Sequence, residues 1–324
     1  MPEIRFGKAI NQALADSMAS DPDVILFGED VAAAGGPFKV TRGLLEAFGP
    51  NRVRDTPISE ATIAGMAVGA ALSGLRPVAE IMFMDFVTLS MDQLVNQAAK
   101  ARFMFGGRNS VGMTLRTPHG GGLNAGPQHS QCLEVWFAHI PGLKVVCPST
   151  PADAYGLLRS AIADPDPVVV VENKALYALK GEIADPPESV PIGAARIARC
   201  GRDATVVTYG ATLQVALDAA ETLSEQGVEL EILDLRSLQP WDETAVLESL
   251  ARTHRLVVLH EAVEAFGVGA EIAARMADVG FDDLDAPIVR VGAPFMPVPF
   301  ARSLEQAYLP DTAQVVAAVR RTLE

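Results

Sequence analysis

Along the chain, continuous apolar runs alternate with stretches whose apolar residues have helical spacing, and this pattern predicts a regular succession of strands and helices. Continuous apolar runs such as Val168–Val171 are typical of strands that are buried on both faces. Stretches such as Ala152–Ala163 instead have apolar residues at the spacing of an amphipathic helix. Continuous apolar strands that alternate with helices predict an α/β fold, with mostly parallel sheets covered by helices.

The expected elements fall into two series, separated by a proline-rich stretch. In the first series, helices are predicted at Phe6–Ala19, Thr41–Phe48, Ala61–Gly74, Phe86–Phe103 and Ala152–Ala163, and strands at Val24–Phe27, around Val53, and at Pro77–Met82, Met113–Arg116, Lys144–Cys147 and Pro167–Glu172. In the second, strands are predicted at Ala204–Tyr209, Val228–Leu233, Leu256–His260 and Ile288–Val291, and helices at Leu213–Gln226, Glu243–Arg252, Val268–Ala277 and Thr312–Leu323. A length of 324 residues favours two domains. We expect residues 1–185 and 196–324 to form them, with 186–195 as the linker.

One apolar segment stands out, and a single carboxylate precedes it. Every residue from Ala61 to Leu75 is apolar, small or a hydroxyl, so this helix is expected to be buried on all sides, with Ser59 as its N-cap. Gly65 and Gly69 have the spacing that lets helix backbones approach closely, which predicts a helix contact, for example at a subunit interface. Glu60 has two interpretations: an acid that stabilises the helix dipole, or a carboxylate held for a cofactor.

Composition and charge narrow the class of protein. The formal net charge of −14 argues against a nucleic-acid partner and against an anionic membrane surface. The apolar run Ala61–Leu75 is shorter than the roughly 20 residues that span a bilayer. The first residues have no signal-peptide pattern, and we expect a cytoplasmic protein. An odd number of scattered cysteines (Cys132, Cys147 and Cys200) is typical of reduced thiols.

Several motifs are incomplete. Gly121–Gly126 has the glycine spacing of a phosphate-binding loop, but Pro127 and Gln128 stand where lysine and a hydroxyl residue belong. The dinucleotide fingerprint that begins at Gly267 has Ile272 in place of its third glycine. His119, His129 and His139 are too widely spaced for a local metal motif. A nucleophile built from Cys132 and His129 is conceivable, although most such thiols are inert packing residues.

Over essentially its full length the chain resembles the β subunit of the thiamine diphosphate-dependent decarboxylase component of 2-oxo acid dehydrogenase complexes, which has a transketolase-like fold. The resemblance is carried, in order, by Gly28-Glu-Asp30, Asp55-Thr-Pro-Ile-Ser-Glu60, Gly74-Leu-Arg-Pro-Val78, Gln128-His-Ser-Gln131, Pro141-Gly-Leu-Lys-Val-Val146, Val169-Val-Val-Glu172, Asp234-Leu-Arg-Ser-Leu238 and His260-Glu-Ala262. The phrase Glu80-Ile-Met-Phe-Met-Asp-Phe86 looks nearest to the pyruvate and acetoin types, and the branched-chain type shares the framework.

The resemblance implies roles for individual residues. Glu60 would hydrogen-bond N1′ of the aminopyrimidine ring of thiamine diphosphate and so promote loss of the thiazolium C2 proton. Ile58, Met82 and Phe86 would line that ring, and His129 would move protons during decarboxylation or acyl transfer. The resemblance further implies an acidic relay through Glu29 and Asp92. A structural potassium site would map to Met113, Ala161, Ile162, Asp164 and Asp166, although relatives often have asparagine at the last position.

A missing motif implies a partner. Enzymes that use this cofactor hold its diphosphate through Mg²⁺ bound by a Gly-Asp-Gly motif, and this sequence contains none. The resemblance therefore implies an α subunit that supplies the Mg²⁺–diphosphate half of the site, in a tetramer of two α and two β chains. Residues 1–185 would be the pyrimidine-binding domain, and 196–324 an assembly domain that also docks a lipoyl-bearing acyltransferase.

Three hypotheses remain at this point. The first is the catalytic β subunit of a pyruvate, acetoin or branched-chain enzyme, with pyruvate favoured. The second is an assembly subunit whose site residues are vestigial, and the joint presence of Glu60, Phe86 and His129 argues against it. The third is a stand-alone NAD-dependent or transketolase-like enzyme, which the incomplete fingerprint and the missing metal motif oppose.

Overall fold

The computed structural model describes residues 1–324, which form two compact units. Unit 1 comprises Met1–His119 and Trp136–Ile192, and unit 2 comprises Gly120–Val135 and Gly193–Glu324. The units divide inside the stretch 186–195 that the sequence suggests as a linker. Residues 120–135, which the sequence places in the middle of the first domain, pack with unit 2 instead.

Unit 1 is built on a parallel sheet with the strand order β6-β7-β5-β4-β2-β3. The strands are β2 (Val24–Gly28), β3 (Val53–Asp55), β4 (Arg76–Glu80), β5 (Thr114–His119), β6 (Lys144–Val146) and β7 (Val168–Asn173). Every residue of β5 and β7 is buried, as expected for central strands covered on both faces. A short antiparallel ribbon, β1 (Glu3–Arg5) with β8 (Lys180–Glu182), was not predicted from the sequence.

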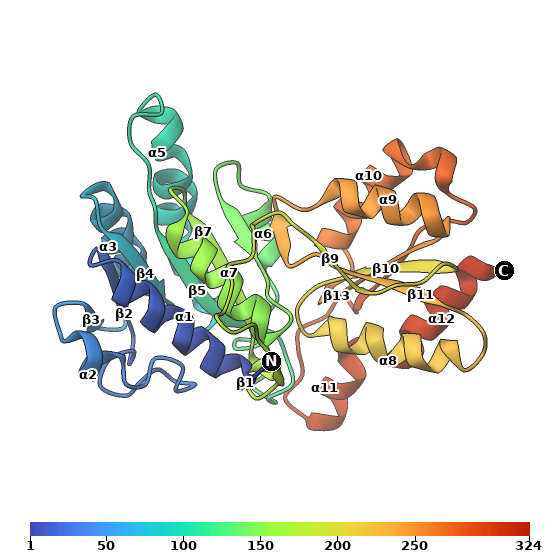
Figure 1. Cartoon of the computed structure of the whole chain (residues 1–324), viewed down its shortest axis with the longest axis horizontal. Helices are drawn as coiled ribbons and strands as arrows, with labels where there is room; N and C mark the ends of the chain where they lie inside the picture. Colours follow the sequence, from blue (N-terminus) through green and yellow to red (C-terminus); the bar gives the residue numbers. More distant parts are fainter. The chain divides into compact units, whose positions relative to one another are not determined.

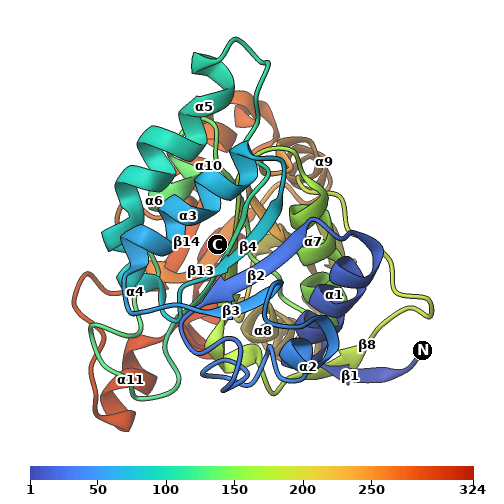
Figure 2. The same cartoon turned by 90° about the vertical axis from the view of Figure 1, so that its left-hand side faces the viewer.

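Helices cover both faces of this sheet (Figure 2). On one side lie α1 (Phe6–Ser20) and α7 (Pro151–Ala163), which pack against each other. On the other side lie α3 (Glu60–Leu72) and α5 (Ala99–Met104). The remaining short helices are α2 (Leu44–Phe48), α4 (Met84–Val87), α6 (Glu134–Ala138) and the 3₁₀ turn η3 (Lys174–Leu176).

Two helices differ from the sequence prediction. The single helix expected at Phe86–Phe103 is divided into α4, a 3₁₀ turn η1 (Thr88–Ser90), a π-helical segment η2 (Gln93–Ala98) and α5. The Thr88 hydroxyl donates to the carbonyl of Asp85 (2.8 Å), which is the kind of local bond that competes with a regular helix. The helix expected at Thr41–Phe48 begins only at Leu44, because Gly43 has a left-handed backbone (φ 85°).

The prediction that Ala61–Leu75 is buried on all sides is wrong for the single chain. Met66 is 45% exposed, and a Cβ atom added at Gly69 would meet nothing within 4 Å. An apolar sequence predicts a buried helix, but part of that burial can come from another chain. Ser59 does stand at the N-cap position of α3, but its hydroxyl bonds that of Thr62 (2.8 Å) rather than a backbone N–H.

Unit 2 contains a five-stranded sheet with the order β14-β13-β10-β11-β9, in which only β9 is antiparallel to its neighbour. Helices α8 and α12 cover one face, and α9 and α10 the other (Figure 1). The strands are β9 (Arg196–Arg199), β10 (Ala204–Thr208), β11 (Leu230–Asp234), β13 (Leu256–Val263) and β14 (Val289–Ala293), with β12 (Ser237–Gln239) between β11 and α9 in the sequence. The helices are α8 (Thr212–Ser224), α9 (Glu243–Thr253), α10 (Val268–Val279), η4 (Phe281–Asp283), α11 (Arg302–Tyr308) and α12 (Thr312–Leu323).

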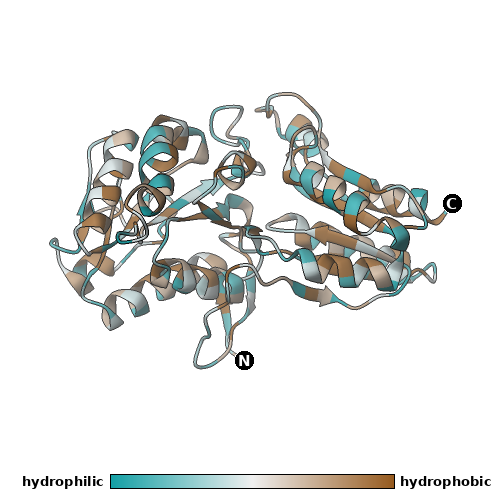
Figure 3. Cartoon of the chain, turned by 90° about the horizontal axis from the view of Figure 1, so that it is seen from above, coloured by the Kyte–Doolittle hydropathy of each residue, from teal (hydrophilic) through white to brown (hydrophobic).

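The core of unit 2 lies between this sheet and helices α8 and α12. Buried alanines and valines such as Ala216, Ala220, Val206 and Val319 fill it, and the strands are drawn largely in brown in Figure 3. No helix in the chain combines the length and the apolar character that crossing a membrane requires. Elements β9, β12 and α11 were not predicted, because they are short and carry arginine, glutamine or glutamate at many positions.

Candidate functional site

Several of the predicted site residues follow neighbouring strands of unit 1. Glu29 follows β2, Glu60 begins the helix after β3, and Met82 follows β4. Because β2, β3 and β4 are parallel, their carboxyl ends lie at one edge of the sheet. Ligands of open α/β sheets bind at this edge. We call Glu29, Ile58, Glu60, Met82 and Phe86 the edge cluster.

The carboxylate of Glu60 lies in a largely buried position and has no hydrogen-bond donor within the chain. Glu60 is only 6% exposed, and its carboxylate accepts no hydrogen bond within the chain. Its backbone carbonyl accepts the Ser90 hydroxyl (2.7 Å), which ties the start of α3 to η1. Unlike Oε1 of Glu29, the side-chain oxygens of Glu60 are not fully buried, so a donor from outside the chain can reach them. This supports the cofactor interpretation over a simple interaction with the helix dipole.

Glu29 lies close enough to Glu60 for the two charges to interact. Burial raises the pKa of the Glu29 carboxyl, and the negative charges of Glu60 and Asp30 raise it further, against the effect of a hydrogen bond from the Ser59 backbone. Its Oε1 atom is buried and has no hydrogen-bond partner. Asp30, the next residue, has a left-handed backbone (φ 56°), so the chain turns sharply after β2. Glu29 therefore takes up a proton at a higher pH than an ordinary glutamate does.

The apolar members of the edge cluster differ in exposure. Ile58 is 81% exposed, whereas Met82 and Phe86 are half-buried. The ring of Phe86 meets Phe83 edge to face, with centroids 5.9 Å apart, and Phe83 meets Phe38 in the same way. These contacts fix the ring of Phe86. The exposed Ile58 offers an apolar surface to a ligand or to another chain.

A buried ionic cluster behind this edge was not recognised in the sequence. The Arg116 guanidinium donates through Nε and Nη2 to the two oxygens of Glu172 (2.8 and 2.9 Å) and through Nη1 to Glu80 (2.5 Å). Tyr177 donates to the same Glu172 carboxylate (2.8 Å). Arg116, Glu80 and Glu172 are all buried, so each charge depends on the others. Charged residues inside the apolar strands β4, β5 and β7 were the signal that could have revealed it.

His129 lies in the part of the chain that packs with unit 2. Its backbone N–H donates to the Gly126 carbonyl (3.3 Å), which closes a turn before the histidine, and the residue is half-buried. The next residue, Ser130, is 2% exposed, and its hydroxyl has no partner. His129 thus stands at the end of a turn beside a buried hydroxyl, where a polar group of a ligand can be accommodated.

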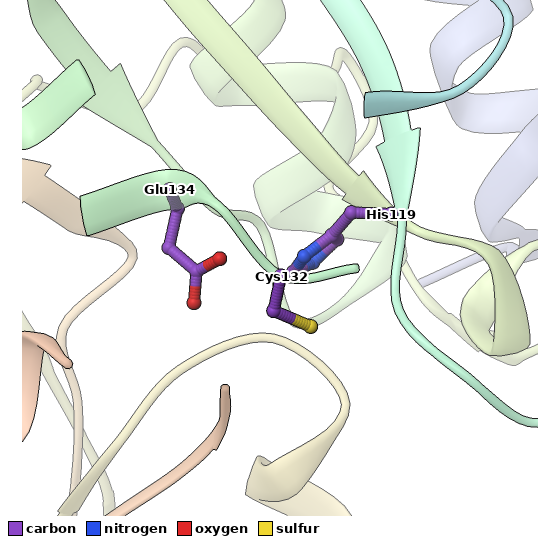
Figure 4. Close-up of side chains that lie close together, drawn as sticks. All are labelled: His119, Cys132 and Glu134. Carbon is purple, nitrogen blue, oxygen red and sulfur yellow. The ribbon is translucent and has the colours of Figure 1, made fainter. Parts of the chain in front are cut away.

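The Cys132 thiol, considered above as a nucleophile, lies near a carboxylate. Figure 4 draws Cys132 on the segment that leads into α6, Glu134 at the first residue of α6, and His119 at the end of β5. The Cys132 thiol lies 3.8 Å from the carboxylate of Glu261. Reactive thiols lie beside cationic groups, so this contact with a carboxylate does not support a nucleophilic Cys132. The three cysteines are free thiols.

Residues suggested for potassium lie together, at the end of unit 1 where β5 and β7 begin. The carbonyl of Met113 accepts the Val168 N–H (3.0 Å), and that of Ile162 accepts the Arg76 guanidinium (3.2 Å). Lys144 binds the Asp164 carboxylate (2.7 Å). Asp166 is bound in the same way by Arg102, and the carbonyl of Ala161 accepts the N–H of Asp164. Positive side chains therefore already bind Ile162, Asp164 and Asp166, backbone N–H groups bind Met113 and Ala161, and potassium binding stays a prediction. Asp92, suggested for an acidic relay, is exposed and bonds Asn96.

Comparisons with known proteins agree with this architecture. The family model "Transketolase, pyrimidine binding domain" matches residues 2–180, and "Transketolase, C-terminal domain" matches residues 193–315. The structure is similar to that of a split-gene transketolase described as an inactive β4 tetramer, with a TM-score of 0.82, 22% identity, and coverage of 99% of this chain and 98% of that one. This similarity shows a transketolase-like fold.

Relatives with much higher identity show the family. The β subunit of acetoin:2,6-dichlorophenolindophenol oxidoreductase from Bacillus subtilis is 48% identical over 99% of this chain and 97% of its own length. The β subunit of the pyruvate dehydrogenase E1 component from Rhizobium meliloti is 46% identical over 99% of this chain and 70% of its own length. The chain therefore belongs to the β subunits of the pyruvate and acetoin dehydrogenase family, with the transketolase pyrimidine-binding and C-terminal domains.

Proposed function

We propose that this chain is the catalytic β subunit of a thiamine diphosphate-dependent 2-oxo acid dehydrogenase component, with pyruvate as the favoured substrate. The reaction is oxidative decarboxylation with transfer of the acyl group to a lipoyl group. The observation that carries the proposal is the buried Glu60 carboxylate, which has no hydrogen-bond donor within its own chain. When bound, thiamine diphosphate supplies the carbon nucleophile and the electron sink for decarboxylation.

The residues of the edge cluster have distinct roles in this proposal. Glu60 would hydrogen-bond the pyrimidine ring of the bound cofactor from its place at the start of α3. Met82, Phe86 and Ile58 line the ring. Glu29 lies beside Glu60, and burial together with the neighbouring negative charges raises its pKa, so it would take up a proton more readily than an ordinary glutamate. Asp92 would extend this acidic relay from its exposed position on the same unit.

His129 is proposed as the general acid and base that moves protons to and from the substrate. The turn closed by Gly126 precedes its side chain, and the buried hydroxyl of the next residue, Ser130, has no partner within the chain. General acid–base catalysis by one histidine typically contributes 10²–10⁴-fold to turnover. Replacement of His129 by alanine is therefore expected to lower kcat by about 10²-fold or more, with thiamine diphosphate still bound.

Partners complete the site in this proposal. Because the sequence has no Gly-Asp-Gly motif, an α subunit provides the Mg²⁺ ligands and the diphosphate half, in a tetramer of two α and two β chains. Unit 2 contributes to assembly and to docking of the lipoyl-bearing acyltransferase.

We further propose a cytoplasmic location. A potassium ion at Met113, Ala161, Ile162, Asp164 and Asp166 would have to share its oxygens with Lys144, Arg76 and Arg102.

Acetoin cleavage is the second candidate reaction. Two relatives, from Bacillus subtilis and Cupriavidus necator, at 48% and 47% identity, are β subunits of acetoin:2,6-dichlorophenolindophenol oxidoreductases. The same Glu60 and His129 would serve this reaction, because both substrates carry a carbonyl next to the bond that breaks. The α chain contributes to the pocket, and one methylene group there changes discrimination by only about 1–3 kcal/mol.

The test is co-expression with the α subunit, followed by assay with thiamine diphosphate, Mg²⁺ and an artificial electron acceptor. Pyruvate, branched-chain 2-oxo acids and acetoin are compared as substrates. Glu60→Gln is expected to reduce turnover by at least about 10²-fold, because the amide cannot share a proton as the acid does. Glu46→Gln, an exposed carboxylate on α2, is the control and should be as active as the wild type. Unchanged turnover of Glu60→Gln would support a purely structural role for this chain.

A further inference from the structure

The segment that carries His129 follows an unusual path, which glycines permit. Gly122 and Gly126 have φ angles of 92° and 74°, and Asn124 between them has 54°. These left-handed conformations favour glycine and, less strongly, asparagine. We call residues 120–131 the histidine loop. Residues 122–124 are all exposed, so the conformation of the loop has to be fixed by specific contacts.

Two carboxylates of unit 2 supply such contacts. The backbone N–H of Gly121 donates to Oε1 of Glu261 (2.6 Å), a residue of β13. The N–H of Asn124 donates to both oxygens of Glu305 on α11 (3.0 and 3.2 Å). Glu305 is 2% exposed, and its two carboxyl oxygens accept from one backbone N–H, which fixes the direction of that N–H.

These contacts explain the glycine spacing that resembles a phosphate-binding loop. In such loops the backbone N–H groups bind phosphate oxygens. Here the N–H groups of Gly121 and Asn124 bind carboxylate oxygens of the protein instead. Carboxylates of the same chain therefore bind the loop where a phosphate would bind in a phosphate-binding loop.

Side-chain packing holds the same loop at two further points. The ring of Phe300 lies so close to Gly126 that a Cβ atom there would collide with three ring carbons. The side chain of Leu309 lies 3.1 Å from the Cβ position of Gly121. Contacts from β13, from α11 and from residues on either side of α11 therefore converge on the part of the loop that precedes His129.

We infer that Glu261 and Glu305 are positioning residues for His129, so that unit 2 sets the geometry of a catalytic side chain of the proposed reaction. The inference rests on the proposed function of His129. The Asn124 N–H bound by Glu305 lies two residues before Gly126, whose carbonyl accepts the His129 N–H. Release of this bond frees the turn that presents the histidine. A displacement of about 1 Å at a catalytic group can lower the rate by 10²-fold.

The experiment uses the assembled tetramer loaded with thiamine diphosphate and Mg²⁺, and the variant Glu305→Ala. Hydrogen–deuterium exchange of peptides that cover the histidine loop should become faster. Turnover should fall about 10-fold or more in kcat, while the dissociation constant of thiamine diphosphate stays within about 2-fold. Glu305→Gln retains one acceptor oxygen and should recover part of both effects. Glu243→Gln, which removes a surface carboxylate of α9 paired with Arg275, is the matched control.

A second variant keeps the inference testable if Glu305→Ala fails to fold. Phe300→Ala removes a side chain that is largely exposed and yet packs on Gly126, so it should also speed exchange in the loop and lower kcat. Unchanged exchange, or faster exchange with unchanged kcat, in the variants that fold would overturn the inference. A wild-type tetramer that is inactive with every substrate would refute the proposed function and the catalytic half of this inference. The exchange measurement would still decide whether the carboxylates hold the loop.

Discussion

The imidazole of His260 lies against the first turn of α10, so that a Cβ atom at Gly269 would stand only 2.8 Å from its Nε2. A Cβ at Gly267 would lie 2.7 Å from Cε1 of the same ring. His260 is fully buried, and its Nδ1 donates to the carbonyl of Ala262 (3.1 Å). The two glycines that look like part of a dinucleotide fingerprint therefore make room for a buried histidine.

Gly269→Ala is expected to destabilise the chain although it lies in a helix. Alanine is the better helix former by about 1 kcal/mol, but the added methyl group collides with a ring that cannot move. Overpacking of this kind costs about 1–3 kcal/mol, measured as a lower urea midpoint. His260→Ala should relieve the collision, so the double variant should lose less stability than the two single variants together. Strictly additive losses would contradict the close contact.

Arg116→Met is expected to be one of the most damaging single substitutions in unit 1. It leaves the buried carboxylates of Glu80 and Glu172 without their cation, and breaking a buried ion cluster costs about 3–5 kcal/mol. The measurement is the free energy of unfolding in urea at pH 7. Lys180→Met, which breaks the exposed pair with Glu3, is the control and should cost about 1 kcal/mol or less. A similar loss in both variants would show that Arg116 acts only through its packing.

Local patterns in the sequence were sufficient to predict most of the regular helices and strands. Continuous valines in β7 and the period of α7 placed a strand and a helix within a residue or two of their observed bounds. The helix expected at Phe86–Phe103 failed because the prediction read only apolar spacing. The bond from Thr88 to the backbone and the π-helical segment are local competitors that spacing does not reveal.

The candidate site was only partly readable from the residues. Glu60 was conspicuous because an acid precedes an apolar helix. The raised pKa of Glu29 follows first from burial and then from the charge of Glu60, and the fold determines both. The hydrogen bond from the Asn124 N–H to Glu305 joins residues 181 positions apart, and no periodicity in the sequence predicts such a bond. The packing of residues 120–135 with unit 2 escaped prediction for the same reason.

Glu29→Gln is expected to stabilise the chain at neutral pH. Burial and the charges of Glu60 and Asp30 raise the pKa of Glu29 in the folded state above its ordinary value of 4.5. The folded state therefore binds this proton more tightly than the unfolded state, and stability falls as the pH rises through that window. The glutamine variant removes this loss. Its advantage in melting temperature should be present at pH 7 and vanish below about pH 4. An advantage that does not change with pH would point to packing rather than charge.

The open face of α3 gives the last prediction, which concerns assembly. Nothing lies within 4 Å of a Cβ at Gly69, and Met66 on the same face is 45% exposed. Gly69→Leu should therefore be tolerated by the isolated chain, and the gain in helix propensity should stabilise it by up to about 1 kcal/mol. If this small-residue face is the subunit contact expected from the Gly65–Gly69 spacing, the same leucine should block the close approach of a partner helix.

Co-purification with the α subunit and light scattering measure the outcome. Gly69→Leu should raise the dissociation constant of the mixed tetramer by at least about 10-fold, which corresponds to a loss of about 1.4 kcal/mol in association. Gln214→Leu, on an exposed face of α8, is the control and should assemble like the wild type. A leucine variant that forms the tetramer with wild-type yield would place the subunit contact elsewhere, because a side chain of that size cannot fit where two backbones meet across glycines.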